Sequence, residues 1–191
     1  MKKIKCLSVF ALIFVLCSFS FRQSNDSDKI FWEKNVKLSW NDYKGKPDPN
    51  MEGVKTYTNY HIKTTSHYFG DSVEYVIKCY VSSQASWVKK EDQNDNLLHH
   101  EQGHFDIGEI FARKIRKAVK EYAFKMESLN KDYNTVFQNL MKECDTYDEL
   151  YDSETTKGEN VDKQKEWEQK IAKELLGMEP YSSWIVKVRP N

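Results

Sequence analysis

The sequence predicts an α+β domain in which strands come first along the chain and helices follow. Between residues 73 and 81, every second residue is apolar, which places five apolar side chains on one face of a strand. After Trp87 the spacing of apolar residues changes to three and four, which is typical of amphipathic helices. The sequence has no internal repeat, so this order favours one domain with separate strand and helix regions.

The N-terminus has the pattern of a secretory signal peptide. Residues 2–5 carry three lysines, and residues 6–19 form an uncharged apolar run. This run is shorter than the roughly 20 residues that cross a bilayer. Ser18-Phe19-Ser20 offers small residues where a signal peptidase cuts. We therefore expect residues 1–20 to be a signal peptide and residues 21–191 to form one exported domain, which is periplasmic, in the cell envelope or extracellular.

Two other fates of the N-terminal segment stay open. A lipoprotein would carry its lipid on Cys17 and associate with a membrane, although Leu16 stands where a small residue is expected. An uncleaved apolar run would instead act as an anchor.

The charge balance excludes two classes of function. The chain has 29 Lys and Arg residues and 29 Asp and Glu residues, and cleavage of the signal peptide would remove three of the lysines. A nucleic-acid binder needs an excess of positive charge, and a multi-span membrane protein needs several long apolar runs. We therefore expect no nucleic-acid partner and no membrane-embedded domain.

Short strands are predicted in the first half of the mature chain. Residues 22–30 are polar, and we expect no regular structure there. Residues 36–40 alternate before a loop with Gly and Pro, and a second strand is predicted over residues 56–64. The clearest strand covers residues 73–81, and Phe69-Gly70-Asp71 supplies the turn before it. These strands therefore form an antiparallel hairpin or meander.

Three helices are predicted after the strands. The first follows residues 92–96, whose Asp and Asn side chains are potential N-caps, and it runs to about Tyr122. The second covers about 133–150, and the third covers about 161–176. Alternating apolar residues at 184–188 predict a short final strand.

Cys79 and Cys144 are the two cysteines that remain after signal cleavage. An oxidising compartment would allow them to form one disulfide. The equally weighted alternative is that both are small buried apolar side chains.

The first predicted helix carries His100-Glu101-Gln102-Gly103-His104, which fits the motif H-E-x-x-H. At about 100° per residue, His100 and His104 lie within about 40° of each other around the helix, so both can bind one zinc ion. Glu101 lies beside that face, where its carboxylate can take a proton from a zinc-bound water as general base. His99 points about 100° away and is interpreted as a surface or substrate-side residue. The motif thus predicts a zinc-dependent hydrolase.

A catalytic zinc site needs a third protein ligand and leaves its fourth position to water. Positions 107 and 110 are both Ile, which excludes the metzincin pattern because that pattern requires Gly and His there. Asp106 and Glu109 lie about 240° and 180° around the helix from His100, so they cannot complete the same site. The expected third ligand is therefore a carboxylate from a later helix.

Positive residues on the same helix alternate with its apolar stripe, which predicts a solvated helix face. These residues are Arg113, Lys114, Arg116, Lys117 and Lys120.

The five tryptophans are spread over different elements, and this favours core packing over a carbohydrate-binding platform.

Three segments of the chain resemble one bacterial family. Residues 97–116, around the histidine motif, look like its signature, and Leu38-Ser-Trp-Asn-Asp-Tyr-Lys-Gly-Lys-Pro47 precedes them. Tyr151-Asp-Ser-Glu-Thr-Thr-Lys-Gly158 follows, with Gln164 and Trp167 beyond it. The family is catalogued as domain of unknown function 922 and is regarded as secreted zinc-dependent proteases. The resemblance implies a zincin-like fold, with an antiparallel sheet before the long motif helix and two further helices.

The family pattern also bears on the third zinc ligand. It reads Tyr-Asp-x-x-Thr-x-His-Gly, and this chain has Lys157 in place of the histidine. If the aspartate is the ligand, as in zinc peptidases with two histidines and one aspartate, Asp152 completes the site; we favour it, with Glu154 and Glu149 in reserve. If the histidine is the ligand, this chain lacks it. The alternative role of Asp152 is to cap or end a helix near Gly158. Lys157 itself is interpreted as solvated, or else as a cation that stabilises a developing oxyanion.

These residues together predict an exported zinc-dependent metallopeptidase that acts on a peptide or protein substrate. His100, His104 and Asp152 are the expected zinc ligands, and Glu101 is the expected general base. The alternative is an envelope binding or scaffold protein that keeps the zincin fold with weak or no activity, as Lys157 suggests. A third interpretation is a hydrolase of another bond, such as an amide in cell-wall peptide.

Overall fold

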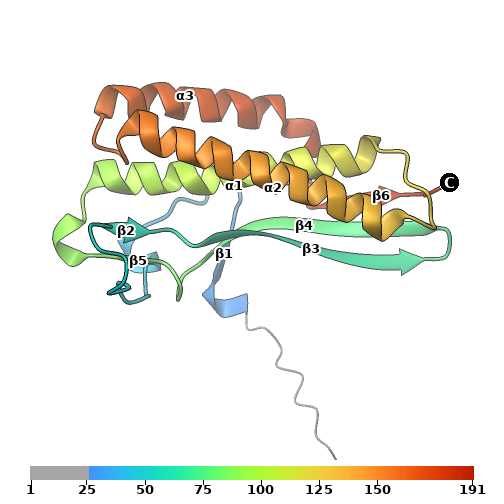
Figure 1. The fold of residues 1–191 in the computed structure, drawn as a ribbon, viewed down its shortest axis with the longest axis horizontal. Helices are drawn as coiled ribbons and strands as arrows, with labels where there is room; N and C mark the ends of the chain where they lie inside the picture. Colours follow the sequence, from blue (N-terminus) through green and yellow to red (C-terminus); the bar gives the residue numbers. More distant parts are fainter. Residues whose placement is uncertain (1–25) are drawn as a thin grey trace, which may run out of the picture.

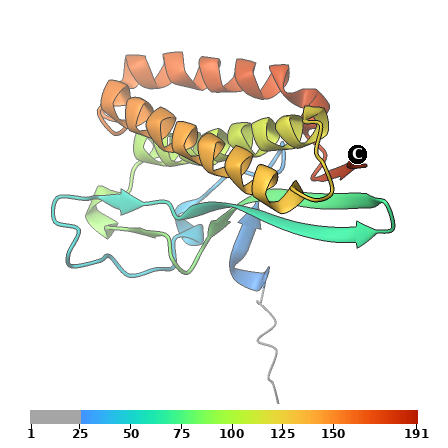
Figure 2. The ribbon, with the colours of Figure 1, turned by 45° about the vertical axis from the view of Figure 1, so that its right-hand side comes forward.

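The structure is a computed structural model that describes residues 26–191. A sheet forms one layer, and three helices cover one of its faces (Figure 1). The view turned by 45° shows the helices on the same side of the sheet (Figure 2). The predicted α+β class is therefore confirmed. The predicted signal peptide lies outside the described residues, among which no helix is long and apolar enough to cross a membrane.

The main sheet is built around its longest strand, β4. Strand β3 pairs with one edge of β4, while β1 and β6 pair with successive parts of the other edge. All three pairings are antiparallel, as the sequence predicts. The four strands are β1 (Lys29–Phe31), β3 (Tyr60–Phe69), β4 (Ser72–Ser82) and β6 (Ile185–Val188).

Alternation along β4 produces the buried face of this sheet. The turn before the strand includes Gly70, whose φ of 60° lies in the left-handed region that favours glycine. The five predicted inward side chains are all buried, which confirms the period-two face. They are Val73, Tyr75, Ile77, Cys79 and Val81.

The first helix lies between the sheet and the other two helices. Helix α1 (Asp95–Glu121) contacts β3, β4 and β6 on one side and the two later helices on the other. Its N-cap is Asn94, whose side chain accepts a hydrogen bond from the Leu97 amide. Because both sides of α1 are covered, buried residues surround most of its circumference. The two later helices are α2 (Leu129–Thr155), which extends beyond its predicted limits at both ends, and α3 (Val161–Gly177).

A small second sheet holds the loop that faces the start of α1. Its strands are β2 (Thr56–Tyr57) and β5 (Trp87–Val88). In the link from β2 to β3, the Asn59 amide donates to Ser86 Oγ at 2.9 Å. These contacts hold Thr58 beside α1.

Three local predictions are wrong because tertiary contacts replace the sequence pattern. Residues 36–40 form no strand, since the Leu38 amide donates to the Gln102 side chain at 2.9 Å. The strand predicted over 56–64 is interrupted by the link between β2 and β3. The polar segment 22–30 contains the start of β1, which pairs with β4.

The disulfide alternative is also wrong, because Cys79 and Cys144 are free and buried. The Cys79 sulfur lies 3.9 Å from the Phe105 carbonyl oxygen, whereas the Cys144 sulfur lies 3.3 Å from the Tyr60 hydroxyl. Both cysteines therefore act as core side chains, as the other alternative predicts.

Two arginines of α1 are buried, which corrects the predicted solvated face. Arg113 Nε and Arg116 Nη1 lie 2.9 and 2.8 Å from the Glu109 carboxylate. Arg116 also donates to the carbonyl oxygens of Ile77 and Tyr181, at 2.8 and 3.1 Å. The prediction failed because these cations are neutralised inside the fold, where α1 is covered on both sides.

Candidate metal centre

Three of the predicted ligands converge where α1 meets the end of α2. His100 Nε2 and His104 Nε2 each lie 3.0 Å from the same oxygen, Oδ1, of Asp152. The two Nε2 atoms lie 3.1 Å from each other. The four-residue spacing on α1 thus places both imidazoles on one face, as predicted, and α2 supplies the carboxylate. These three residues form a group that could hold a metal ion.

The outer nitrogens of both imidazoles are held by acceptors. His104 Nδ1 lies 3.0 Å from the Asp148 carboxylate, which can only accept when ionised, so Nδ1 carries a proton. His100 Nδ1 lies 3.3 Å from Gln164 Oε1. The amide nitrogen of Gln164 donates to the Tyr151 hydroxyl at 2.7 Å, and this bond turns Oε1 toward His100. Both Nε2 atoms are therefore left to face Asp152.

This arrangement calls for a positive charge at its centre. With neutral imidazoles, two Nε2 lone pairs and a carboxylate oxygen would meet at about 3 Å with no donor between them. Burial alone would lower the pKa of His104, but hydrogen bonds to Asp148 and Asp152 raise it to about 10. Burial alone would raise the pKa of Asp152, but its hydrogen bonds with the two histidines hold it well below the ordinary range. Both shifts arise because the imidazole nitrogens and the carboxylate oxygen lie so close together.

The ligand set fits zinc in type and in spacing. Two imidazole nitrogens and one carboxylate oxygen are typical of catalytic zinc sites, which leave one coordination position open. Tetrahedral bonds of about 2.0–2.1 Å put neighbouring ligand atoms about 3.3 Å apart. The distances of 3.0–3.1 Å between these ligand atoms are close to that value. Asp152 is 35% exposed while His100 is 2% exposed, so the centre reaches solvent at the aspartate.

A tyrosine fixes the two imidazole rings from the side of α2. Tyr151 stacks on His100 with ring centroids 4.6 Å apart and meets His104 edge-on at 5.0 Å. Its hydroxyl donates to the His100 carbonyl oxygen at 3.1 Å. A Cβ at Gly103 would lie only 2.1 Å from that hydroxyl. The glycine inside the histidine motif therefore makes room for the tyrosine that orients the ligands.

The chain turns sharply just after the aspartate ligand. Thr156, Lys157 and Gly158 all have positive φ angles, of 50°, 53° and 83°. The Lys157 amide donates to the Asp152 carbonyl oxygen at 2.9 Å, which ends α2. A Cβ at Gly158 would lie 2.8 Å from His100 Cβ, so the turn packs directly against a ligand. The Lys157 side chain is exposed, as one of its two interpretations predicts.

Glu101 lies close to the two histidine ligands but is not one of the three metal-binding residues. It is 4% exposed, and burial raises the pKa of its carboxyl group while the two histidines oppose that shift. Thr58 donates a hydrogen bond to its Oε2 atom, and the Thr58 and Tyr43 hydroxyls lie 2.6 Å apart. Thr58 thus holds the Oε2 atom of Glu101, and this hydrogen bond leaves Oε1 unused.

The reserve ligands and the neighbouring histidine lie outside the centre. Glu154 accepts a hydrogen bond from the Trp167 indole at 2.8 Å, and the Glu149 side chain is exposed. His99 is exposed and lies 4.0 Å from Glu168, which agrees with its surface interpretation. Of the carboxylates proposed from the sequence as the third ligand, the structure therefore brings Asp152 to the histidines.

The residues that support the ligands, above all Asp148, were not predicted from the sequence. A local pattern could have revealed it, because the chain reads Tyr147-Asp148-Glu149-Leu150-Tyr151-Asp152. The repeated Tyr-Asp pair at a spacing of four places both carboxylates on one face of α2. Gln164 and Thr58 come from distant segments, so no local spacing indicates them.

Comparison with known proteins finds one family. Residues 35–159 match the family described as "Bacterial protein of unknown function (DUF922)". This span includes the three ligand residues and Glu101. Neither the curated proteins nor the solved structures give a significant match.

Proposed function

The chain belongs to the DUF922 family, and from its candidate metal centre we propose that it is an exported zinc-dependent metallopeptidase. The observation that carries this proposal is the meeting of two Nε2 atoms and one carboxylate oxygen at 3.0–3.1 Å, beside a buried glutamate. The signal-peptide pattern of residues 1–20 supports export.

The chain's own residues divide the work between holding the metal and moving a proton. His100, His104 and Asp152 would hold zinc, and Asp148 and Gln164 keep the imidazoles oriented through Nδ1. Zinc held there would supply Lewis acidity, which polarises a substrate carbonyl and acidifies water.

Glu101 is the proposed general base. Thr58 fixes its Oε2 atom, so Oε1 is available to take a proton from the water that attacks the peptide carbonyl. The same oxygen then returns the proton to the leaving amine nitrogen, so the carboxylate is regenerated in each turnover. Its position one residue after His100 keeps it beside the ligands rather than among them.

The proposed fold is zincin-like. A sheet packs against a long helix that carries H-E-x-x-H, and a later helix supplies the third ligand. This arrangement supports the assignment through the order of elements and the role of each one.

The test is metal content combined with peptide hydrolysis. We expect the purified protein to retain about one zinc per chain and to cleave an unbiased peptide library. Glu101→Gln keeps the shape of the side chain but removes its basicity, so it should retain zinc and lose at least about 100-fold in rate. A protein without zinc after purification in zinc-containing buffer, or equal hydrolysis by Glu101→Gln, would contradict the proposal.

A second candidate function is a metal-binding envelope protein that does not catalyse hydrolysis. Two observations favour it: Thr58 already donates a hydrogen bond to Glu101, and Lys157 stands where the family pattern has histidine. This candidate predicts bound zinc and no cleavage of any library peptide. The same experiment therefore separates the two functions.

A further inference from the structure

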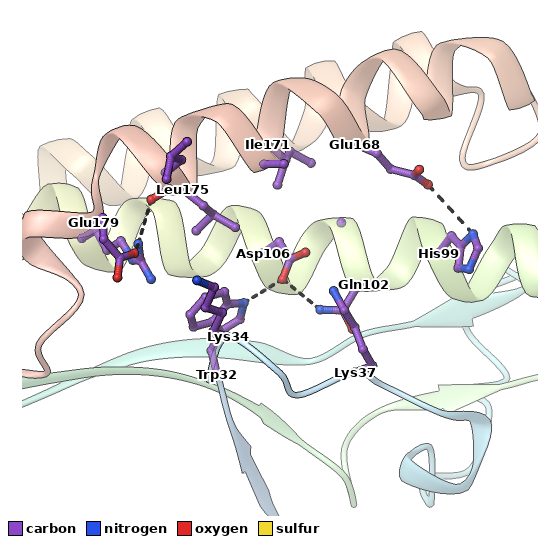
Figure 3. A pocket seen from close by; sticks show the side chains of 14 residues that line it. Trp32, Lys34, Lys37, His99, Gln102, Asp106, Glu168, Ile171, Leu175 and Glu179 are labelled. Atoms are coloured by element: carbon purple, nitrogen blue, oxygen red, sulfur yellow. Dashed lines mark hydrogen bonds and ion pairs between the residues drawn. The ribbon is translucent and has the colours of Figure 1, made fainter.

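A cavity lies on a different flank of α1 from the metal centre. Its volume is about 740 Å³, which is within the range of small-ligand pockets. One wall is α1 and the other is α3, and the segment around Trp32 closes it (Figure 3). The residues that line it do not include His100, His104 or Asp152. The cavity is therefore a separate candidate site.

The α3 wall of the cavity is apolar and partly exposed. Its apolar residues are Ile171, Ala172, Leu175 and Leu176, and the last of these is 73% exposed. A large aliphatic side chain with that exposure gains stability when another apolar surface covers it. This wall favours a ligand with an apolar body.

The opposite wall carries one carboxylate with unused capacity. Trp32 Nε1 and Gln102 Nε2 donate to Asp106 at 2.7 and 2.8 Å, and both hydrogen bonds end on Oδ1. Figure 3 shows the Asp106 side chain on α1, with Trp32 on one side of it and Gln102 on the other. Neither bond uses Oδ2, so this oxygen can accept a further hydrogen bond. A cationic donor from a ligand would satisfy it.

The other charged groups of the cavity divide into paired and unpaired residues. Arg113 is held by carboxylates, and His99 lies beside Glu168. Lys34 and Lys37 are exposed, and among the described residues neither forms an ion pair. The cavity therefore offers an acceptor inside, an apolar wall and two free ammonium groups.

We propose that this cavity binds a short apolar peptide with free ends. The peptide's α-ammonium group contacts Asp106 Oδ2, and its apolar side chains cover Leu175 and Leu176. Its carboxylate faces Lys34 and Lys37. This ligand matches all three chemical features of the cavity, whereas a fatty acid leaves Asp106 unsatisfied and an alkylamine leaves the lysines unused. The site stands independently of hydrolysis at the metal centre.

The test uses tri-leucine in four forms: unmodified, N-acetylated, C-amidated, and modified at both ends. Binding is followed by NMR at the Trp32 indole N–H, which contacts Asp106 directly; Trp32→Phe assigns that resonance. We expect N-acetylation to weaken binding about tenfold or more, because it removes a charge-assisted hydrogen bond. C-amidation should weaken it about threefold, since the lysines are solvated.

Two variants locate the site on the cavity. Asp106→Asn should bind the unmodified and N-acetylated peptides equally, whereas Asp71→Asn, at the exposed β3–β4 turn, should retain the tenfold preference. Leu176→Ser changes an exposed side chain, so it tests the apolar wall even if Asp106→Asn does not fold; it should weaken all four peptides alike. Equal binding of free and N-acetylated tri-leucine to the native protein would overturn the proposal, as would no shift of the Trp32 resonance. Octylammonium bound more tightly than tri-leucine would also overturn it.

Discussion

Helix α1 carries two buried charged clusters about two turns apart, and they are built on opposite principles. In the first, which we call the arginine cluster, Glu109 is matched by Arg113 and Arg116. Both arginines also donate to backbone carbonyls, and Arg113 donates to Glu179 as well. In the second, the metal centre, His100 and His104 face carboxylates on α2. Donors and acceptors are balanced within the arginine cluster, while in the metal centre two Nε2 atoms and a carboxylate oxygen lie 3.0–3.1 Å apart and need a proton or a metal ion between them.

The difference teaches how buried charge can be interpreted. Burial alone does not distinguish a structural cluster from a functional one, because both clusters are largely buried. The two clusters are distinguished by whether the hydrogen-bond donors in each cluster match its acceptors in number. A cluster closed by its own protein groups contributes to folding, whereas a cluster with excess acceptors is open to a metal ion.

The largest expected effect is on stability, in the arginine cluster. Arg116→Met leaves Glu109 with less compensation and two backbone carbonyls without their donor. We expect a loss of about 3–5 kcal/mol in the free energy of unfolding, measured by urea denaturation. Lys117→Met, at the next and exposed position, is the control and should change stability by less than about 0.5 kcal/mol. Equal effects of the two variants would show that the arginine cluster is not a structural unit.

The next effect belongs to the metal centre and depends on zinc. At free zinc 100 times the dissociation constant, the free energy of unfolding should rise by about 2.7 kcal/mol, and a chelator should reverse this gain. Asp152→Ala removes one of the three ligands, so most of the zinc-dependent gain should disappear. Glu149→Gln, an exposed change on the same helix, should keep the full gain. An undiminished response in Asp152→Ala would remove this residue from the ligand set.

The smallest of the three effects concerns the support of a ligand. Asp148→Asn weakens the hold on His104 Nδ1 without removing a ligand, so zinc affinity should fall by about 10–100-fold. Competition with a zinc-binding dye measures this change. Asp145→Asn, an exposed aspartate one turn earlier, should leave the affinity unchanged. If both variants bind zinc like the native protein, then Asp148 only contributes to packing.

The sequence predicts the parts of the fold and site that depend on local spacing. Alternation marks β4, and the spacing of His100 and His104 places both on one face of α1. Asp152 needed the family resemblance, because helix spacing alone could only exclude the acids on α1. The burial of Arg116 could not be foreseen, since its partners Ile77 and Tyr181 belong to segments far away in the chain.

The edge of β4 opposite β3 is completed by the two ends of the described chain. Residues 29–31 cover one part of it and residues 185–188 cover the other. A chain that emerges from its N-terminus cannot finish this edge until residues 185–188 have been made, and contacts so distant in sequence close slowly. Because β6 also contacts α1, the layer that supports the metal-bearing helix is finished only after all three helices have been made. A chain shortened by its final seven residues would therefore keep every metal ligand and still lack the complete support beneath them.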